Sequence, residues 1–433
     1  MSDVAPGPAK PTARTASGKK PTVFIFITVL LDVVGLGIII PVLPQLITEV
    51  SGTPGAPIVT LSDAAIIGGW LMFAYAFMQF FAAPFLGNVS DAVGRRPVLL
   101  VGIAMLAVDY LIMAVAPTLV WLFIGRTLSG LAAATFATAF AYLADVSTKD
   151  GRAASFGLVG AAFGVGFVIG PALGGLLGSI DVRWPFFAAA ALCVANFLFG
   201  LFVLPESLPP ENRRPFDIKR ANPVGTVVSL WPVKSVILLL LAYGCLELAL
   251  QVYPAVWAYF TPLRFGWSTV EVGLSLAFFG VLIAIGEGLI LRLGIKVGGP
   301  HLVMLAATGV QIVSLILFAI IASPVWLYAV MVISGISGIG TTALQAMASS
   351  SVDETRQGEV NASVTAMKSM VFFIAPPLMT GLFAVFTQPD TNVPYLPGAP
   401  FLFAALIACL SFWPYARARA SLPGEASPGS AGV

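Results

Sequence analysis

Residues 23–47 read VFIFITVLLDVVGLGIIIPVLPQLI, an apolar run interrupted by one carboxylate, Asp32. The run can cross a bilayer as a helix, which takes about 20 apolar residues. An ionised carboxylate at bilayer depth costs about 2.5–3.5 kcal/mol on the mildest insertion scale. A chain retains such a group where it is paired, faces water or carries protons, so this stretch predicts a membrane helix with a role in transport.

The composition of the whole chain is that of a membrane protein. Hydrophobic residues make up 58% of its 433 residues and charged residues 10%, whereas a soluble domain has roughly 25% charged residues. The sequence contains no basic cluster with interleaved aromatic residues, so we expect no nucleic-acid partner. It also contains no P-loop, metal-ligand run or nucleophile elbow, so we expect no metal, no cofactor and no enzyme activity.

Twelve apolar runs follow one another along the chain. A polar, proline-rich linker at 205–232 separates six runs in residues 21–204 from six in residues 233–415. Most Lys and Arg residues fall on the side that holds this linker and the two chain ends, which the positive-inside rule makes cytoplasmic. We therefore expect disordered cytoplasmic tails at 1–20 and 416–433. The expected spans are 22–47, 64–86, 97–117, 119–143, 153–178, 185–204, 233–260, 270–293, 301–322, 325–349, 361–386 and 399–415.

The two halves resemble each other. LSGLAAATFATAFAYLAD (128–145) is similar to ISGISGIGTTALQAMASS (333–350), and Pro171 and Pro376 are separated by the same offset. Halves related in this way place a binding site at their interface near the middle of the membrane, and alternating access is the natural mechanism. The prediction is an all-α polytopic membrane protein with twelve transmembrane helices in two pseudo-symmetric six-helix halves.

The loop after the second span reads GNVSDAVGRRPVLL (87–100). It resembles the signature loop of the major facilitator superfamily, G-x-x-x-D-R-x-G-R-R, with Ala92 where that family usually has a base. A basic loop that only sets topology would explain the two arginines but not the Gly–Asp–Gly spacing. The resemblance implies a gating motif made of Gly87, Asp91, Gly94, Arg95 and Arg96.

The fifth span contains GVGFVIGPALGGLLG (164–178). It resembles the antiporter motif of drug:proton antiporters, a glycine-rich helix bent at proline. Ordinary packing of small residues is the alternative, since such packing is common between membrane helices. The order G-P-x-x-G-G favours the antiporter motif, which comprises Gly166, Gly170, Pro171, Gly174 and Gly175.

Further stretches narrow the resemblance to the bacterial tetracycline–proton antiporter branch, among them LDVVGLGIIIPVLP (31–44), AVDYLIMAVAP (107–117) and VDETRQGEV (352–360). The resemblance implies a carrier in the bacterial inner membrane that exchanges a small molecule for protons. By the same resemblance, the membrane carboxylates of the first and third helices and the arginine of the fourth correspond to Asp32, Asp109 and Arg126.

The second half departs from the tetracycline pattern. Gly266 stands where that branch carries a histidine, and Gln311 stands where it carries a ninth-helix aspartate. We therefore expect a specificity different from tetracycline itself.

Protons are predicted to load at Asp32, with Arg126 as its electrostatic partner and Asp109 assisting. Desolvation favours the protonated form of a carboxyl group and a nearby cation favours the charged form, so substrate that disturbs the pair would exchange a proton. The alternative is a purely structural salt bridge between Asp32 and Arg126, although a buried pair is weak evidence for stability.

The spans of the second half carry more polar groups. Glu247 and Gln251 are spaced i, i+4 and share one helix face. We predict substrate-binding residues Glu247, Gln251, Glu287, Gln311, Gln345 and Lys368. The glutamates suit a cationic drug and the lysine suits an anionic metabolite, and the sequence leaves both open.

The favoured function is therefore proton-coupled export of a small amphiphilic, drug-like compound by a carrier that we expect to be a monomer in the lipid bilayer. The alternative is a proton-coupled carrier of an anionic metabolite with the same fold.

Overall fold

The computed structural model describes residues 19–52, 59–147, 152–217, 233–353, 356–389 and 392–421. These residues are mostly helical and include no strand. Most of the predicted tails and the linker residues 218–232 lie outside the described residues. The last helix continues to Ser421, beyond the end predicted at residue 415.

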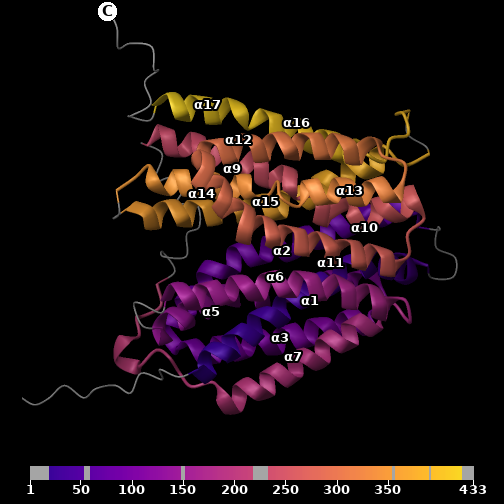
Figure 1. Ribbon diagram of the computed structural model, residues 1–433. Helices are drawn as coiled ribbons and strands as arrows, with labels where there is room; N and C mark the ends of the chain where they lie inside the picture. Colours follow the sequence, from indigo (N-terminus) through magenta and orange to yellow (C-terminus); the bar gives the residue numbers. More distant parts are fainter. Residues whose placement is uncertain are drawn as a thin grey trace, which may run out of the picture.

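The first half contains six spans that run back and forth through one bundle (Figure 1). Two short helices share its fourth span, because the helix breaks at Ala134. The elements are α1 (Lys19–Ser51), α2 (Leu61–Val93), α3 (Arg95–Val115), α4 (Leu119–Ala133), α5 (Thr135–Val146), α6 (Arg152–Gly178) and α7 (Trp184–Val203), followed by the short helix η1 (Pro210–Asn212).

The second half repeats this arrangement with more breaks inside its spans. A π-helical segment, η3, interrupts the eighth span. The elements are α9 (Lys234–Leu250), α10 (Val252–Phe265), α11 (Thr269–Ile285), η3 (Gly286–Ile290), α12 (Leu291–Ile320), α13 (Pro324–Ser334), α14 (Ile339–Ser350), α15 (Gln357–Val385), α16 (Ala399–Leu410) and α17 (Phe412–Ser421).

The helix α12 contains parts of two spans. Gly299 has φ 71° and ψ 173°, a conformation outside the helical region, and Pro300 starts the next helix. In the described part of the chain, 11 helical segments are long and apolar enough to cross a membrane, and Thr269–Ile320 is the one that Gly299 divides. The predicted twelve-helix fold is thereby confirmed.

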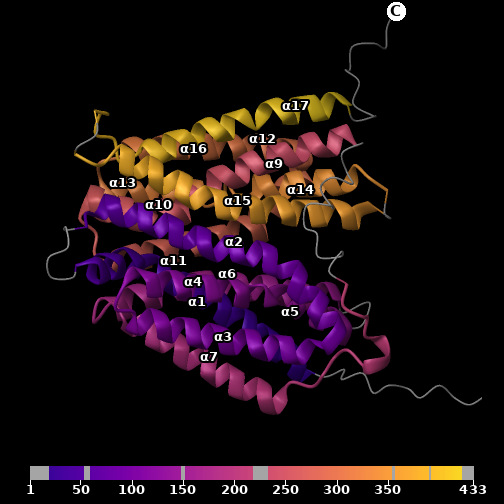
Figure 2. The same ribbon diagram turned by 180° about the vertical axis from the view of Figure 1, so that it is seen from behind.

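The two halves lie side by side as separate bundles, indigo to magenta and rose to yellow, in both views (Figures 1 and 2). Helix α2 packs against α15 and helix α6 against α11 across the boundary. We call the end where α7 stops and α9 begins the linker end, and the opposite end, where α1 stops and α2 begins, the far end.

The second span of each half begins with the same local structure. Thr60 and Asp63 form a capping box at the start of α2, and Ser268 and Glu271 form one at the start of α11. Each box satisfies backbone N–H groups that the first helical turn leaves unpaired. The two halves thus share a helix start at the far end as well as the sequence similarity of their fourth spans.

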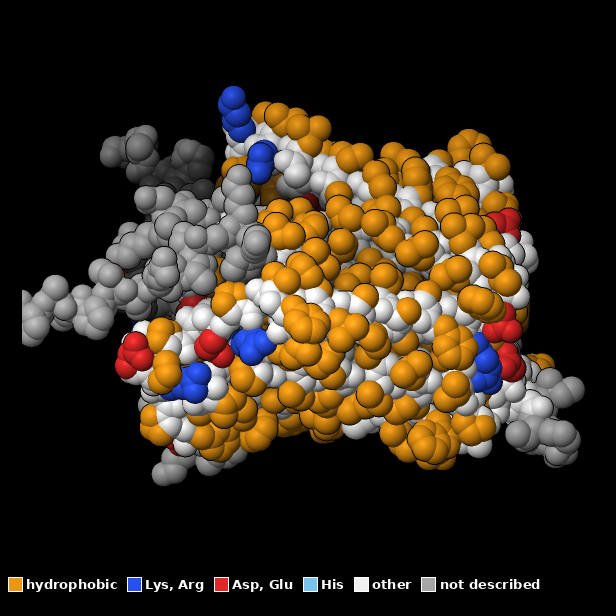
Figure 3. All heavy atoms as spheres, turned by 90° about the horizontal axis from the view of Figure 1, so that it is seen from below, with side chains coloured by type: hydrophobic (Ala, Val, Ile, Leu, Met, Phe, Trp, Pro, Cys, Tyr) orange, Lys and Arg blue, Asp and Glu red, His pale blue; other side chains and the backbone are white. Residues whose placement is uncertain are grey.

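The outer surface fits a bilayer. In Figure 3 hydrophobic side chains cover the middle of the face, and charged side chains gather at its two ends. Large apolar residues such as Phe202, Val297 and Val325 are strongly exposed. A water-soluble monomer rarely exposes contiguous apolar surface on this scale, so the chain is a multi-pass membrane protein.

Candidate functional site

A buried ion pair lies between the third and fourth spans. Arg126 Nη2 of α4 lies 2.5 Å from Asp109 Oδ2 of α3, with side-chain exposures of 5% and 0%. Gly125 leaves room for this contact, since a Cβ there would lie 2.8 Å from Asp109 Oδ1. The pair uses one oxygen and one nitrogen, while the buried Asp109 Oδ1 and Arg126 Nε have no hydrogen-bond partner among the described residues. Such an incompletely bonded pair adds little to stability.

Asp32 lies on α1 and is 8% exposed. It forms no hydrogen bond or ion pair with any residue that the structure describes. The predicted pairing of Asp32 with Arg126 is therefore wrong in this conformation, because α3 packs directly against α4 and brings Asp109 to the arginine instead. Tyr110 and Cys193 lie within electrostatic range of both carboxylates. We call Asp32, Asp109 and Arg126 the N-half acid cluster.

The predicted gating loop is held inside the first half. Arg95 Nη1 lies 2.6 Å from Asp91 Oδ1 and also donates to Ser90 Oγ at 2.6 Å. Its Nε lies 3.4 Å from Asp145 Oδ2 of α5. Gly94, with φ 112°, makes the turn between α2 and α3 that this arrangement needs. A Cβ at Gly87 would meet no atom within 4 Å, so packing does not require glycine there.

Glu206, which the sequence analysis did not single out, completes this loop. Its carboxylate accepts hydrogen bonds from the backbone N–H groups of Arg95 at 2.8 Å and Arg96 at 3.2 Å. A carboxylate at the start of α3 accepts from N–H groups that the helix leaves unpaired, and its negative charge interacts favourably with the positive end of the helix dipole. The backbone N–H of Arg214 also donates to the Asp91 carbonyl at 3.0 Å, so the start of the linker lies on the loop.

Helix α6, which carries the predicted antiporter motif, is packed closely on two sides. A Cβ at Gly170 would lie 2.6 Å from the Val34 carbonyl oxygen of α1, and one at Gly175 would lie 2.7 Å from the Thr269 carbonyl oxygen of α11. Gly166 and Gly174 similarly face α1. The glycines therefore let one helix contact both the acid-bearing α1 and the other half of the molecule.

Four of the predicted substrate residues of the second half, Glu247, Gln251, Gln311 and Gln345, lie apart from Glu287 and Lys368 in their hydrogen bonds. Glu247 is buried and accepts a hydrogen bond from the Tyr243 hydroxyl at 2.8 Å, and Gln251 lies at the break between α9 and α10. Gln311 is buried on α12, and its Nε2 has no partner among the described residues. Gln345 Nε2 donates to Asn361 Oδ1 at 3.5 Å. In the described part of the chain, no hydrogen bond joins these amides to the glutamates.

Glu287 lies in the π-helical segment η3. The Thr342 hydroxyl of α14 lies 3.0 Å from its Oε1 and 3.2 Å from its Oε2. Lys368 on α15 and Glu247 on α9 both lie within electrostatic range of this carboxylate. Short π-helical segments are frequent at functional sites. The flanking Gly286 and Gly288 were the only local signal of this distortion in the sequence.

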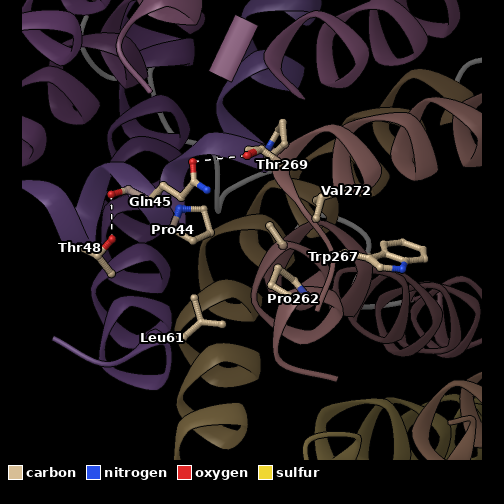
Figure 4. A pocket seen from close by; sticks show the side chains of 10 residues that line it. Pro44, Gln45, Thr48, Leu61, Pro262, Trp267, Thr269 and Val272 are labelled. Carbon is tan, nitrogen blue, oxygen red and sulfur yellow. Dashed lines mark hydrogen bonds between the residues drawn. The ribbon is translucent and has the colours of Figure 1, made fainter. Parts of the chain in front are cut away.

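Side-chain hydrogen bonds between described residues join the two halves at the far end. Asp63 Oδ1 accepts from Gln388 Nε2 at 2.9 Å, and the hydroxyls of Ser62 and Thr387 lie 2.7 Å apart. Gln45 Oε1 accepts a longer bond of 3.4 Å from Thr269, drawn in Figure 4. Gln45 and Thr269 line a small cavity of about 100 Å³ between side chains of α1, α2, α10 and α11 (Figure 4).

Aromatic rings join the halves closer to the middle of the membrane. Phe373 of α15 packs against Phe73, Phe77 and Phe80 of α2. The contacts described for α2 and α15 thus run from the far end to mid-membrane, and the polar groups Glu287 and Lys368 lie on the linker side of them.

Comparison with known proteins agrees with this architecture. The sequence profile of the Major Facilitator Superfamily matches residues 25–290 and 239–431. The tetracycline resistance protein, class C, of Escherichia coli is 37% identical over 88% of this chain and 94% of its own length. The class D protein of Salmonella ordonez is 33% identical over 90% of this chain and 96% of its own.

Solved structures share the fold at lower identity. The nucleoside transporter NupG has a TM-score of 0.69 at 15% identity, covering 93% of this chain and 99% of that one. The human organic anion transporter MFSD10 (TETRAN) has a TM-score of 0.68 at 20% identity, covering 92% and 99%.

Proposed function

Because this chain belongs to the Major Facilitator Superfamily, and is a secondary transporter rather than an enzyme, we propose that it exports a small amphiphilic, drug-like compound in exchange for protons. The observation that carries the proposal is Asp32, a buried carboxylate with no bonded partner in the described structure, beside the Asp109–Arg126 pair. Ionisable groups inside a membrane are functional by default and mark ion pathways.

Proton exchange would use two arrangements of the N-half acid cluster. In the described conformation Arg126 neutralises Asp109, and Asp32 has no neighbouring cation in ion-pair contact. A desolvated carboxyl group without a cation favours its protonated form, and a cation that approaches it favours release of the proton. A shift of Arg126 from Asp109 towards Asp32 on substrate binding would therefore discharge a proton from α1.

Alternating access would be a rocking of the bundles 21–204 and 233–415 about α6 and α11. The far-end hydrogen bonds hold that end closed here, so opening requires breaking Asp63–Gln388 and Ser62–Thr387. In this proposal the linker end, where Arg95 and Arg96 lie, is the cytoplasmic side of a bacterial inner membrane. The gating loop residues, now bonded within the first half, would act when the linker end closes.

A second candidate is a proton-coupled carrier of an anionic metabolite. The observation that favours it is Lys368, an exposed ammonium inside a span with no ion pair in the described part of the chain.

Gradient-driven dye accumulation tests proton coupling. Proteoliposomes with an acidic interior and dye outside are expected to accumulate the dye rhodamine B when they contain the parent protein. Asp32→Asn keeps the shape and removes titration, so it should equilibrate dye but no longer accumulate it. Glu49→Gln, which changes a far-end acid paired with Arg183, serves as the matched control. Accumulation by Asp32→Asn equal to that of the control would contradict the proposal.

A further inference from the structure

Two opposite charges lie at the same depth on different helices of the second half. Glu287 lies about three turns before Gly299, where the eighth span ends. Lys368 lies about three turns after Gln357, where α15 begins. At 1.5 Å per residue both lie roughly 16–18 Å from the linker end. They are within electrostatic range of each other but form no ion pair, since none joins them in the described structure.

Both charges lie on helices of the second half that pack on the first half, α15 on α2 and α11 on α6. Lys368 precedes Phe372 by one turn, and Phe372 packs against Tyr75 of α2 with ring centroids 6.4 Å apart. Glu287 follows Gly280 by about two turns, and Gly280 faces Phe167 and Val168 of α6. Residues four or seven apart share a helix face. Lys368 thus lies on the face of α15 that packs on α2, and Glu287 lies just beyond the part of α11 that packs on α6.

The carboxylate is held in place, whereas the ammonium is accessible. The Thr342 hydroxyl reaches both oxygens of Glu287 and so orients the group. Lys368 is exposed and has no bonded partner among the described residues. Glu247, the third charge in range, is already bonded to Tyr243 and more buried. The charges that no ion pair neutralises in this part of the described structure are thus one oriented carboxylate and one exposed ammonium.

We infer that Glu287 and Lys368 form a recognition site for a zwitterionic amphiphile, with the ligand's cationic group at Glu287 and its anionic group at Lys368. This inference rests on the proposed export function and names its substrate class. Complementary charges on both sides favour a molecule with both signs, and a ligand with one charge leaves the other protein charge unpaired in a poorly hydrated site. Such a ligand carries both the cationic group expected of a drug and the anionic group expected of a metabolite, the two alternatives that the sequence left open.

Equilibrium binding of three related dyes tests the site without any gradient. Rhodamine B is zwitterionic, rhodamine 6G is its cationic ester relative and fluorescein is anionic, all on one xanthene scaffold. Fluorescence anisotropy with the full chain in lipid nanodiscs at constant pH is expected to show rhodamine B binding about 5- to 30-fold more tightly than either relative, as one partly exposed charged hydrogen bond implies.

The variants assign each end of the ligand. Glu287→Gln should remove the preference over fluorescein, and Lys368→Met should remove the preference over rhodamine 6G. The charge swap Glu287→Lys with Lys368→Glu should restore rhodamine B binding that each single swap loses, which a misfolded protein cannot do. Lys296→Met, which removes an exposed lysine near the linker end of the same span as Glu287, should change nothing.

Equal affinity for the three dyes in the parent protein, or unchanged ratios in Lys368→Met, would overturn the inference. Binding that follows the expected pattern together with unchanged accumulation by Asp32→Asn would instead overturn proton coupling and leave this site standing. The two proposals therefore fail in different measurements.

Discussion

The far-end contact between Asp63 and Gln388 offers the sharpest test of how the halves are held together. The two oxygens of Asp63 have separate roles: Oδ2 accepts from the backbone N–H and hydroxyl of Thr60, and Oδ1 accepts from Gln388 at 2.9 Å. Gln388→Leu therefore removes the bond between the halves and leaves the capping box in place. A hydrogen bond to a charged group contributes about 1.5–3 kcal/mol, and partial exposure reduces this to about 1–2 kcal/mol.

That loss should move the conformational equilibrium by a predictable factor. Since about 1.4 kcal/mol is tenfold in an equilibrium constant, the far-end-open population should rise about 5- to 30-fold. Gln45→Leu is the matched comparison, because the Gln45–Thr269 bond is neutral and 3.4 Å long. Its removal should change the population by roughly twofold, for a bond of about 0.5 kcal/mol.

Cysteine accessibility measures the open population. Ala258 lines the far-end cavity and is 4% exposed, so Ala258→Cys, in a background with the native cysteines replaced, should react with an impermeant maleimide only when the far end opens. The labelling rate should rise for Gln388→Leu by the factor above. An unchanged rate, or an equal rise for Gln45→Leu, would refute the view that Asp63–Gln388 is the main polar bond closing this end.

Three further predictions concern the first half. Arg126→Met should lower the stability of the purified protein by about 3–5 kcal/mol because it leaves Asp109 buried and unpaired, and the double variant with Asp109→Leu should recover most of this loss. A thermal unfolding series measures both variants. Losses that simply add in the double variant would count against the pairing of Arg126 with Asp109. Glu206→Gln should lower stability by about 1 kcal/mol through loss of charge at the start of α3, measured in the same series beside the exposed Glu211→Gln as control. Gly170→Leu should abolish dye accumulation in proteoliposomes, since its side chain would enter the α1 backbone, whereas Gly164→Leu, with no neighbour within 4 Å of its Cβ position, should retain it.

The fold could be predicted from the sequence because the membrane imposes simple rules. Long apolar runs, the charge bias and the internal repeat each depend on composition and spacing, which a single chain displays. The predicted loop between the eighth and ninth spans, residues 294–300, contains Gly299-Pro300, where a positive φ and a proline end one helix and start another. The eighth span therefore continues up to Gly299, beyond the end predicted at residue 293. The extension of the last helix to Ser421 was missed because its final residues, with Arg417 and Arg419, are not apolar.

Pairings between side chains were less accessible to sequence reasoning. Helical spacing predicts which residues share a face, but the partner of Arg126 depends on how α3, α4 and α1 pack around it. The resemblance of the first half to the tetracycline branch suggested Asp32 as the partner of Arg126. The structure shows Asp109 in the ion pair with Arg126 instead. The π-helical segment at Glu287 depends on a hydrogen-bond register inside one helix, which no periodicity of apolar residues reports.

The placement of charge in the two halves argues for a division of roles between them. Asp32 and Glu247 lie at matching positions, each at the same separation from the lysine that begins its helix, so the repeat supplies an acid at one depth in both first helices. In the first half an arginine and a second carboxylate accompany that acid and are almost inaccessible. In the second half Tyr243 already binds it, and the accessible charges are Glu287 and Lys368. A closed cluster suits protons, which need no space, whereas an open pair suits a molecule. The same fold can then change its substrate by altering the second half while the residues that we propose for proton coupling in the first half remain.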